Sequence, residues 1–191
     1  MPCMGTVRDS ITGDLRTWIQ QQHVFFVATA PLATDGLVNC SPKGLDSLRV
    51  LGPTEIAYVD LTGSGAETIA HIRENGRIVI MFCAFAGPPK IVRLHGRGTI
   101  IERGSADFDR LHSAFPEHLG TRAIIHVSVT RVSDSCGYAV PLYDFGSDRQ
   151  TLTRWAEAKG REGLHAYRHQ KNAFSIDGLP ALTESPGATE T

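Results

Sequence analysis

The 191-residue sequence lacks the features that would assign it to several specialised classes of protein. Its four cysteines, Cys3, Cys40, Cys83 and Cys136, are isolated from one another, so neighbouring thiols form neither a Cys-x-x-Cys redox pair nor a zinc ribbon. The longest strongly apolar run, 78–86, is far shorter than the ~20 residues that span a bilayer, and the N-terminus lacks a basic region followed by an apolar core. We therefore expect reduced thiols, no membrane partner and a cytoplasmic location.

An excess of charge of one sign is also absent. Nineteen basic residues stand against twenty acidic ones, for a formal net charge of −1, so no global field draws the chain to nucleic acid or to an anionic membrane. With 41% hydrophobic and 20% charged residues the composition is that of a globular protein, and 19 glycines and 10 prolines indicate many turns. We expect one domain over residues 1–182 and a disordered tail over 183–191, which is rich in Thr, Glu, Gly, Ser and Pro.

Short strands dominate the secondary structure that the sequence predicts. Apolar and β-branched runs bounded by Gly, Pro and Asn predict strands at 23–30, 37–40, 48–51, 56–61, 77–85, 90–102 and 123–132. Helical spacing and capping residues predict helices at 14–19, 66–74 and 105–115, and a C-terminal helical region opened by Ser147. One central helix among so many strands does not fit alternating βαβ units. The predicted fold is therefore mainly β, an antiparallel barrel with peripheral helices.

The first candidate binding segment is the turn Asn-Cys-Ser-Pro-Lys-Gly at 39–44, where a predicted strand ends. Backbone N–H groups, the Ser41 hydroxyl and the Lys43 ammonium can all be offered there to one phosphate. A strand-ending turn with a solvated lysine is an equally good interpretation of this segment alone. No metal site is expected anywhere, since His165 and His169 have the spacing of a zinc pair but lack a third ligand.

The second candidate segment is the turn Thr-Gly-Ser-Gly-Ala-Glu-Thr at 62–68, which opens the central helix. The free N–H groups and the positive dipole end of a helix N-terminus favour an anion. The segment matches neither the Walker motif nor the Gly-x-Gly-x-x-Gly fingerprint, and Ser64 with Glu67 is also the pattern of a simple capping box. Because each segment follows a strand, the two can supply both halves of a phosphate pocket.

A third candidate is the face of the strand at 90–102 that carries Arg93, His95 and Arg97. Alternation along a strand places these three side chains together, and an alternating basic face is also a common solvated surface. Lys90 and Arg93, nearest the start of the strand, are the preferred contributors to an anion site.

The order of these motifs resembles the pyridoxamine 5'-phosphate oxidase-like family of FMN-binding split barrels. The resemblance rests on the turns at 39–44 and 60–65, the Asn-Gly-Arg at 75–77 and the Val-Arg-Leu-His-Gly at 92–96, and it covers roughly residues 15–141. The segment 133–141 is similar to the Asp-Ser-Cys-Gly-Tyr/Phe segment of an uncharacterised bacterial branch of this family. The resemblance implies a split β-barrel homodimer that holds FMN in a groove at the subunit interface.

Carried over residue by residue, the resemblance implies a set of cofactor contacts. Ser41 and Lys43 would contact the FMN phosphate, Asn39 and Cys40 would run beside the ring, and the other implied contacts are Thr62, Ser64, Thr68, Lys90 and Arg93. The oxidase that forms the vitamin carries an Arg-Lys pair where this chain has Glu67 and Thr68, and its C-terminal substrate segment has no match here. The fold and cofactor are therefore carried over more firmly than pyridoxamine 5'-phosphate as substrate.

The expected function is that of an FMN-binding oxidoreductase that passes a hydride between the flavin and a small organic substrate. No catalytic residue is assigned, because hydride transfer to the ring need not require an acid or base of the protein. Two alternatives stay open: a deazaflavin-dependent reductase on the same fold, and a non-catalytic flavin or haem carrier or sensor. The sequence names neither the substrate nor the electron donor.

Overall fold

The computed structural model describes residues 5–182 and contains eight strands and four helices over that range. The strands are β1 (Val7–Arg8), β2 (Phe25–Thr29), β3 (Asn39–Lys43), β4 (Leu48–Gly52), β5 (Glu55–Leu61), β6 (Arg77–Cys83), β7 (Ile91–Glu102) and β8 (Thr121–Ser135). The helices are α1 (Gly13–Gln20), α2 (Glu67–Asn75), α3 (Ala106–His112) and α4 (Thr151–Lys171). Cys3 and the tail expected at 183–191 lie outside the described residues.

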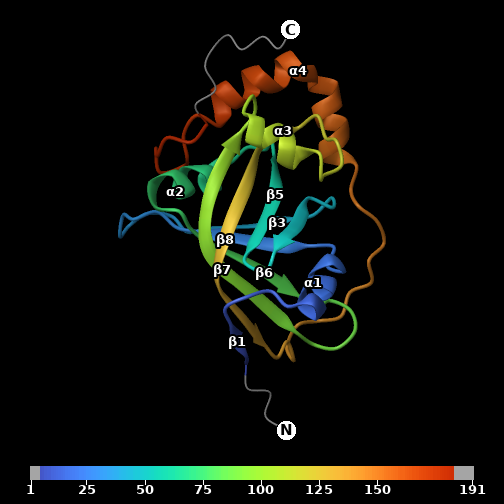
Figure 1. Cartoon of the computed structure of the whole chain (residues 1–191). Coiled ribbons are helices and arrows are strands. Elements are labelled where there is room, and N and C mark those ends of the chain that lie inside the picture. Colours follow the sequence, from blue (N-terminus) through green and yellow to red (C-terminus); the bar gives the residue numbers. More distant parts are fainter. Residues whose placement is uncertain (1–4, 183–191) are drawn as a thin grey trace.

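All the strands belong to one antiparallel sheet in the order β3-β2-β6-β7-β8-β5-β4, with β1 added beside β8. The long strands β7 and β8 form its middle and pair from Ile91 opposite Ser135 to Glu102 opposite Ala123. In Figure 1 helices α3 and α4 lie at one end of the curled sheet, and α1 lies toward the other. The prediction of a mainly antiparallel β fold with few helices is confirmed.

Two apolar cores hold the sheet and helices together. The larger core gathers α1, α2 and the inner face of the sheet around side chains such as Ile69, Tyr58 and Phe25, and the Phe25 and Tyr58 rings meet edge to face at 5.5 Å. The smaller one lies under α3, where Phe108 packs with Ala57 and other residues of β5 and β8. Because β5 is covered on both faces, its sequence is an apolar run rather than an alternating one.

Local signals placed several element ends correctly. Gly76 ends α2 in the left-handed region with φ of 69°, and its N–H donates to the Ile72 carbonyl at 2.9 Å. Ser105 caps α3 by accepting from the N–H of Phe108 at 3.2 Å. Within residues 5–182 no helix is both long and apolar enough to cross a membrane.

Other local predictions were wrong. The α2 helix is capped at Ala66 and not by Ser64, and no side chain accepts from its first N–H groups. Strand β1 was not predicted, because two residues carry no periodic signal. The C-terminal helix begins at Thr151 rather than at Ser147, and it is interrupted at Gly160, where φ is 65° and ψ is 177°.

A buried ion-pair cluster joins two strands that share no hydrogen-bond ladder. Asp60 of β5 is fully buried, and its carboxylate accepts from Lys43 Nζ of β3 at 3.2 Å and from Arg122 Nε of β8 at 2.7 Å. β3 is the edge strand of the sheet and is separated from β5 by four strands in the sheet order. The cluster therefore closes the curled sheet at a place where backbone pairing does not.

We predict that Asp60→Asn lowers the free energy of unfolding by about 3–5 kcal/mol, because it leaves the buried Arg122 cation and the half-buried Lys43 ammonium without their carboxylate. Urea unfolding followed by circular dichroism measures the loss. Asp107→Asn is the matched control, since Asp107 and its partner Arg110 are both exposed and such pairs contribute roughly 0–1 kcal/mol. An equally small effect at Asp60 would contradict a closing role.

The same cluster predicts the acid sensitivity of the fold. Burial raises the pKa of Asp60, but the charges of Arg122 and Lys43 outweigh burial and hold that pKa below its ordinary value of 3.8. Stability from a depressed carboxyl pKa is present above the ordinary value and is lost as the pH falls through the folded value. Between about pH 5 and pH 2 the free energy of unfolding should therefore fall more steeply for the wild type than for Asp60→Asn. If the free energy of unfolding depended on pH in the same way in the wild type and in Asp60→Asn, Asp60 would not be the source of the acid sensitivity.

Candidate functional site

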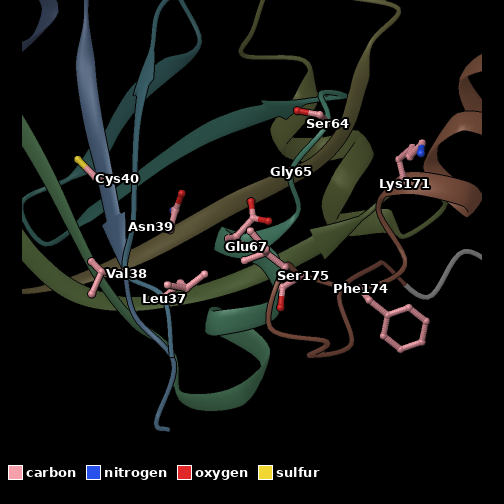
Figure 2. Close-up of a pocket in the computed structure, with 11 residues that line it drawn as sticks. Leu37, Val38, Asn39, Cys40, Ser64, Gly65, Glu67, Lys171, Phe174 and Ser175 are labelled. Atoms are coloured by element: carbon pink, nitrogen blue, oxygen red, sulfur yellow. The ribbon is translucent and has the colours of Figure 1, made fainter. Parts of the chain in front are cut away.

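A groove of about 730 Å³ lies where three segments distant in the sequence meet. Its walls come from the β2–β3 connection with the start of β3, from the turn between β5 and α2, and from the segment that ends α4 and follows it (Figure 2). The lining residues are Leu37, Val38, Asn39, Cys40, Ser64, Gly65, Glu67, Lys171, Phe174, Ser175 and Ile176. The segment at 39–44 is therefore strand β3 and not the predicted turn, and its first two residues share one groove with part of the turn at 62–68.

The nine predicted contacts divide by position. Asn39, Cys40 and Ser64 line the groove. Ser41, Lys43, Thr62, Thr68, Lys90 and Arg93 are not among its lining residues. Their roles as cofactor contacts stay predictions.

The alternation of β3 determines which way the side chains of this segment point. Asn39, Ser41 and Lys43 stand opposite Thr29, Val27 and Phe25 of β2, on the face turned toward the core, whereas Cys40 is exposed on the other face. Asn39 is fixed there by two hydrogen bonds from Nδ2, to Thr29 Oγ1 at 3.1 Å and to Thr68 Oγ1 at 3.0 Å. Thr68 therefore supports a groove residue from behind.

A short chain of hydrogen bonds continues from Asn39 into the core. Thr29 Oγ1 accepts from Asn39 and lies 3.0 Å from Nδ1 of His71, so its own proton is free to be donated to that nitrogen. Burial lowers the pKa of His71, although Asp177, Glu67 and Glu74 each raise it in part. A neutral His71 with an unprotonated Nδ1 fits this chain, which holds the Asn39 amide in one orientation.

The three cationic side chains predicted to contact the cofactor each interact with a residue outside the groove. Lys43 donates to the buried Asp60 carboxylate, and Lys90 places its ammonium 4.9 Å from the centre of the Trp18 ring. Arg93 donates through Nη1 to Ser135 Oγ at 3.1 Å. Among the residues that line the groove the cation is Lys171, which was not singled out from the sequence.

The turn before α2 gives the groove an uneven charge. The cap residue Ala66 has no side-chain acceptor for the first N–H groups of α2, and the helix dipole adds positive potential there. The Glu67 carboxylate folds back over Gly65 and lies in the same wall, with Ser64 beside it (Figure 2). An anion in the groove would therefore meet donors from the backbone and from Ser64, and one opposing carboxylate.

The segment after α4 is held against both other walls. Arg168 Nε donates to Thr62 Oγ1 at 2.9 Å, and Asn172 Nδ2 donates to the Gly63 carbonyl at 2.9 Å. On the other side the Asp177 carboxylate accepts from the N–H of Leu37 at 2.9 Å. The C-terminal region thus completes the groove of its own chain.

The donor groups of the groove are organic rather than a cluster of metal ligands. Residues 5–182 contain no group of three or more His, Cys, Asp or Glu side chains placed to hold a metal ion. The groove offers the Ser64 hydroxyl and the Lys171 ammonium as donors, the Asn39 amide oxygen and the Glu67 carboxylate as acceptors, and apolar surface, a lining suited to a small organic ligand.

Comparison with known proteins gives consistent matches. The sequence model of the pyridoxamine 5'-phosphate oxidase family matches residues 11–136. The pyridoxamine 5'-phosphate oxidase family protein ustO of Aspergillus flavus is 40% identical over 195 residues, which cover 91% of this chain and 76% of that protein.

Solved structures share the fold at low identity. A variant of HupZ from Group A Streptococcus has a TM-score of 0.51 and 23% identity, and the match covers 65% of this chain and 99% of that one. A candidate pyridoxamine 5'-phosphate oxidase from Lactobacillus delbrueckii has a TM-score of 0.50 and 16% identity, over 69% of this chain and 98% of that one. At such identities these matches show a common split-barrel fold.

We predict that Asn172→Ala loosens the C-terminal wall of the groove. The fully buried Asn172 side chain donates to the carbonyl of the half-exposed Gly63, and losing a hydrogen bond of this kind costs about 0.5–1.5 kcal/mol. Limited proteolysis should cut the variant faster within the segment after α4. Gln170→Ala, an exposed position on the same helix, is the control, and equal cleavage rates for the two variants would contradict the anchoring role.

Proposed function

The chain belongs to the pyridoxamine 5'-phosphate oxidase family, and on that premise we propose that it is a cytoplasmic FMN-binding oxidoreductase that acts as a homodimer. The proposed reaction passes a hydride between the flavin and a small organic substrate. The observation that carries the proposal is the groove, in which a strand edge, an uncapped helix N-terminus and a C-terminal wall surround one space.

The residues of the groove fit the two ends of FMN. Ser64 and the N-terminus of α2 suit the phosphate, since a helix N-terminus offers both donors and positive potential. The strand edge at Asn39 and Cys40 suits the flat ring, where a fixed amide can hydrogen-bond and the neighbouring apolar surface can cover it. Bound FMN would supply the hydride chemistry, and the chain would bind and orient the ring.

The predicted contacts outside the groove take supporting positions in this proposal. Thr62 and Thr68 hold Arg168 and Asn39 in place, and Ser41 is a hydroxyl whose oxygen is buried with no hydrogen-bond partner among residues 5–182. Lys90 and Arg93 do not reach the groove of their own chain, so as flavin contacts they would come from the second subunit. In the proposed homodimer, each flavin would therefore be contacted by residues of both subunits.

The experiment that tests the proposal examines the small molecules carried by the protein. Flavin absorbance of the purified protein, followed by mass spectrometry of what denaturation releases, should identify FMN. Anaerobic addition of a nicotinamide donor should then bleach the flavin bands. A bound flavin that no donor reduces would favour a carrier or sensor, and a Soret band or a deazaflavin mass would replace the FMN assignment.

We predict that Gly65→Val weakens FMN binding at least tenfold, about 1.4 kcal/mol, by filling the wall of the groove. The new side chain would displace only the flexible carboxylate of Glu67, so the fold should be retained. Titration by flavin fluorescence measures the affinity. Gly146→Val is the control, because nothing lies within 4 Å of a Cβ placed there, and equal affinities in the two variants would place the flavin elsewhere.

A further inference from the structure

We propose that Lys171 supplies the positive charge that recognises the phosphate of the bound flavin, an inference that rests on the proposed function. It concerns a residue at the last position of α4, more than a hundred residues from the Ser64 turn with which it shares the groove. The chemical class recognised is a phosphate monoester attached to a flat aromatic ring system.

The charges that line the groove single out this lysine. Among the lining residues Lys171 is the cation and Glu67 is the anion (Figure 2). Lys171 is exposed, and no carboxylate among residues 5–182 forms an ion pair with it. A phosphate dianion at the start of α2 would be repelled by Glu67, so an exposed cation in another wall of the groove gives the compensation that the site requires.

The backbone on both sides of Lys171 is held by hydrogen bonds, whereas its side chain is exposed. Arg168, three residues earlier, is bonded to Thr62, and Asn172, the next residue, is bonded to Gly63. Both bonds end on the turn that leads into α2. The Lys171 backbone is therefore held beside the proposed phosphate position, and its four-carbon side chain allows the ammonium to reach the phosphate.

Competing cations are less suitable. Lys43 could reach a phosphate only by leaving Asp60, a fully buried carboxylate, with Arg122 as its remaining cation partner. Breaking a buried ion pair opposes binding, whereas recruiting Lys171 breaks no ion pair among the described residues. The geometry thus separates a structural lysine, Lys43, from a ligand-binding lysine, Lys171.

The test compares FMN with riboflavin, which has the same ring system but no phosphate. Dissociation constants are measured by flavin fluorescence for the wild type, Lys171→Gln and Lys171→Arg. Charge-assisted hydrogen bonds contribute enough that Lys171→Gln should weaken FMN binding roughly ten- to hundred-fold. Riboflavin affinity should not change, and Lys171→Arg should restore much of the preference for FMN. The FMN affinity of Lys171→Gln should also depend less on salt than that of the wild type.

Two further variants make the outcome specific. Arg154→Gln removes one positive charge from the exposed surface of the same helix, and it should leave the ratio of FMN to riboflavin affinity unchanged. Lys43→Gln tests the earlier assignment, with its thermal unfolding measured in parallel because its ion pair with Asp60 is lost. A selective loss of FMN affinity in Lys43→Gln and not in Lys171→Gln would overturn the proposal.

Failure of the inference is distinguishable from failure of the proposed function. A wild-type protein that binds neither flavin removes the proposed function and the inference with it. A wild type that binds both flavins equally, or a Lys171→Gln variant that loses both equally, leaves flavin binding in place and overturns the phosphate role of Lys171.

Discussion

The buried carboxylate of Asp60 is the interaction on which the rest of the structure depends. The hydrogen-bond ladder of the sheet ends at β3 on one side and β4 on the other, so backbone pairing alone does not bring β3 to β5. Asp60 gathers Lys43 of β3 and Arg122 of β8 at one point, and an unpaired carboxylate there would be costly. Since Asn39 begins the strand that Lys43 ends, and Thr62 follows Asp60 closely, this closure also places the two walls of the groove opposite each other.

Much of the fold could be predicted because its signals are local. The strand at 90–102 has an alternating pattern, and β7 matches its predicted bounds almost residue for residue. Gly76 and Ser105 end and begin helices by hydrogen bonds to residues three or four positions away. The segment at 39–44 was expected to be a turn at the end of a strand, but it forms strand β3 itself, and its first two residues line the same groove as the turn at 62–68. Ser64 misled because its three-residue spacing to Glu67 mimics a capping box, whereas Glu67 folds back over Gly65.

The parts of the site that could not be predicted depend on contacts between distant residues. Nothing near Lys43 in the sequence identifies Asp60 as its partner. A lysine in a predicted turn is more often exposed to solvent than paired with a buried carboxylate. The sequence of the C-terminal helix has only amphipathic periodicity. This pattern predicts that one face is buried, but it does not identify the element against which that face packs. Arg168 and Thr62 are separated by 106 positions and Asn172 and Gly63 by 109, so the third wall of the groove became visible only in three dimensions.

The way this third wall is held also determines what ligand binding must cost. Asn172 is fully buried at one end of the segment, and Ala181 and Leu182 enter the main core at the other. Between them Phe174 and Ile176 are exposed, so the wall is a strap anchored at both ends. Because a pre-formed wall loses little conformational entropy when a ligand arrives, most of the ordering cost is left to individual side chains. Among the charged residues of the groove, Lys171 is the one that combines a fixed backbone with an exposed ammonium group.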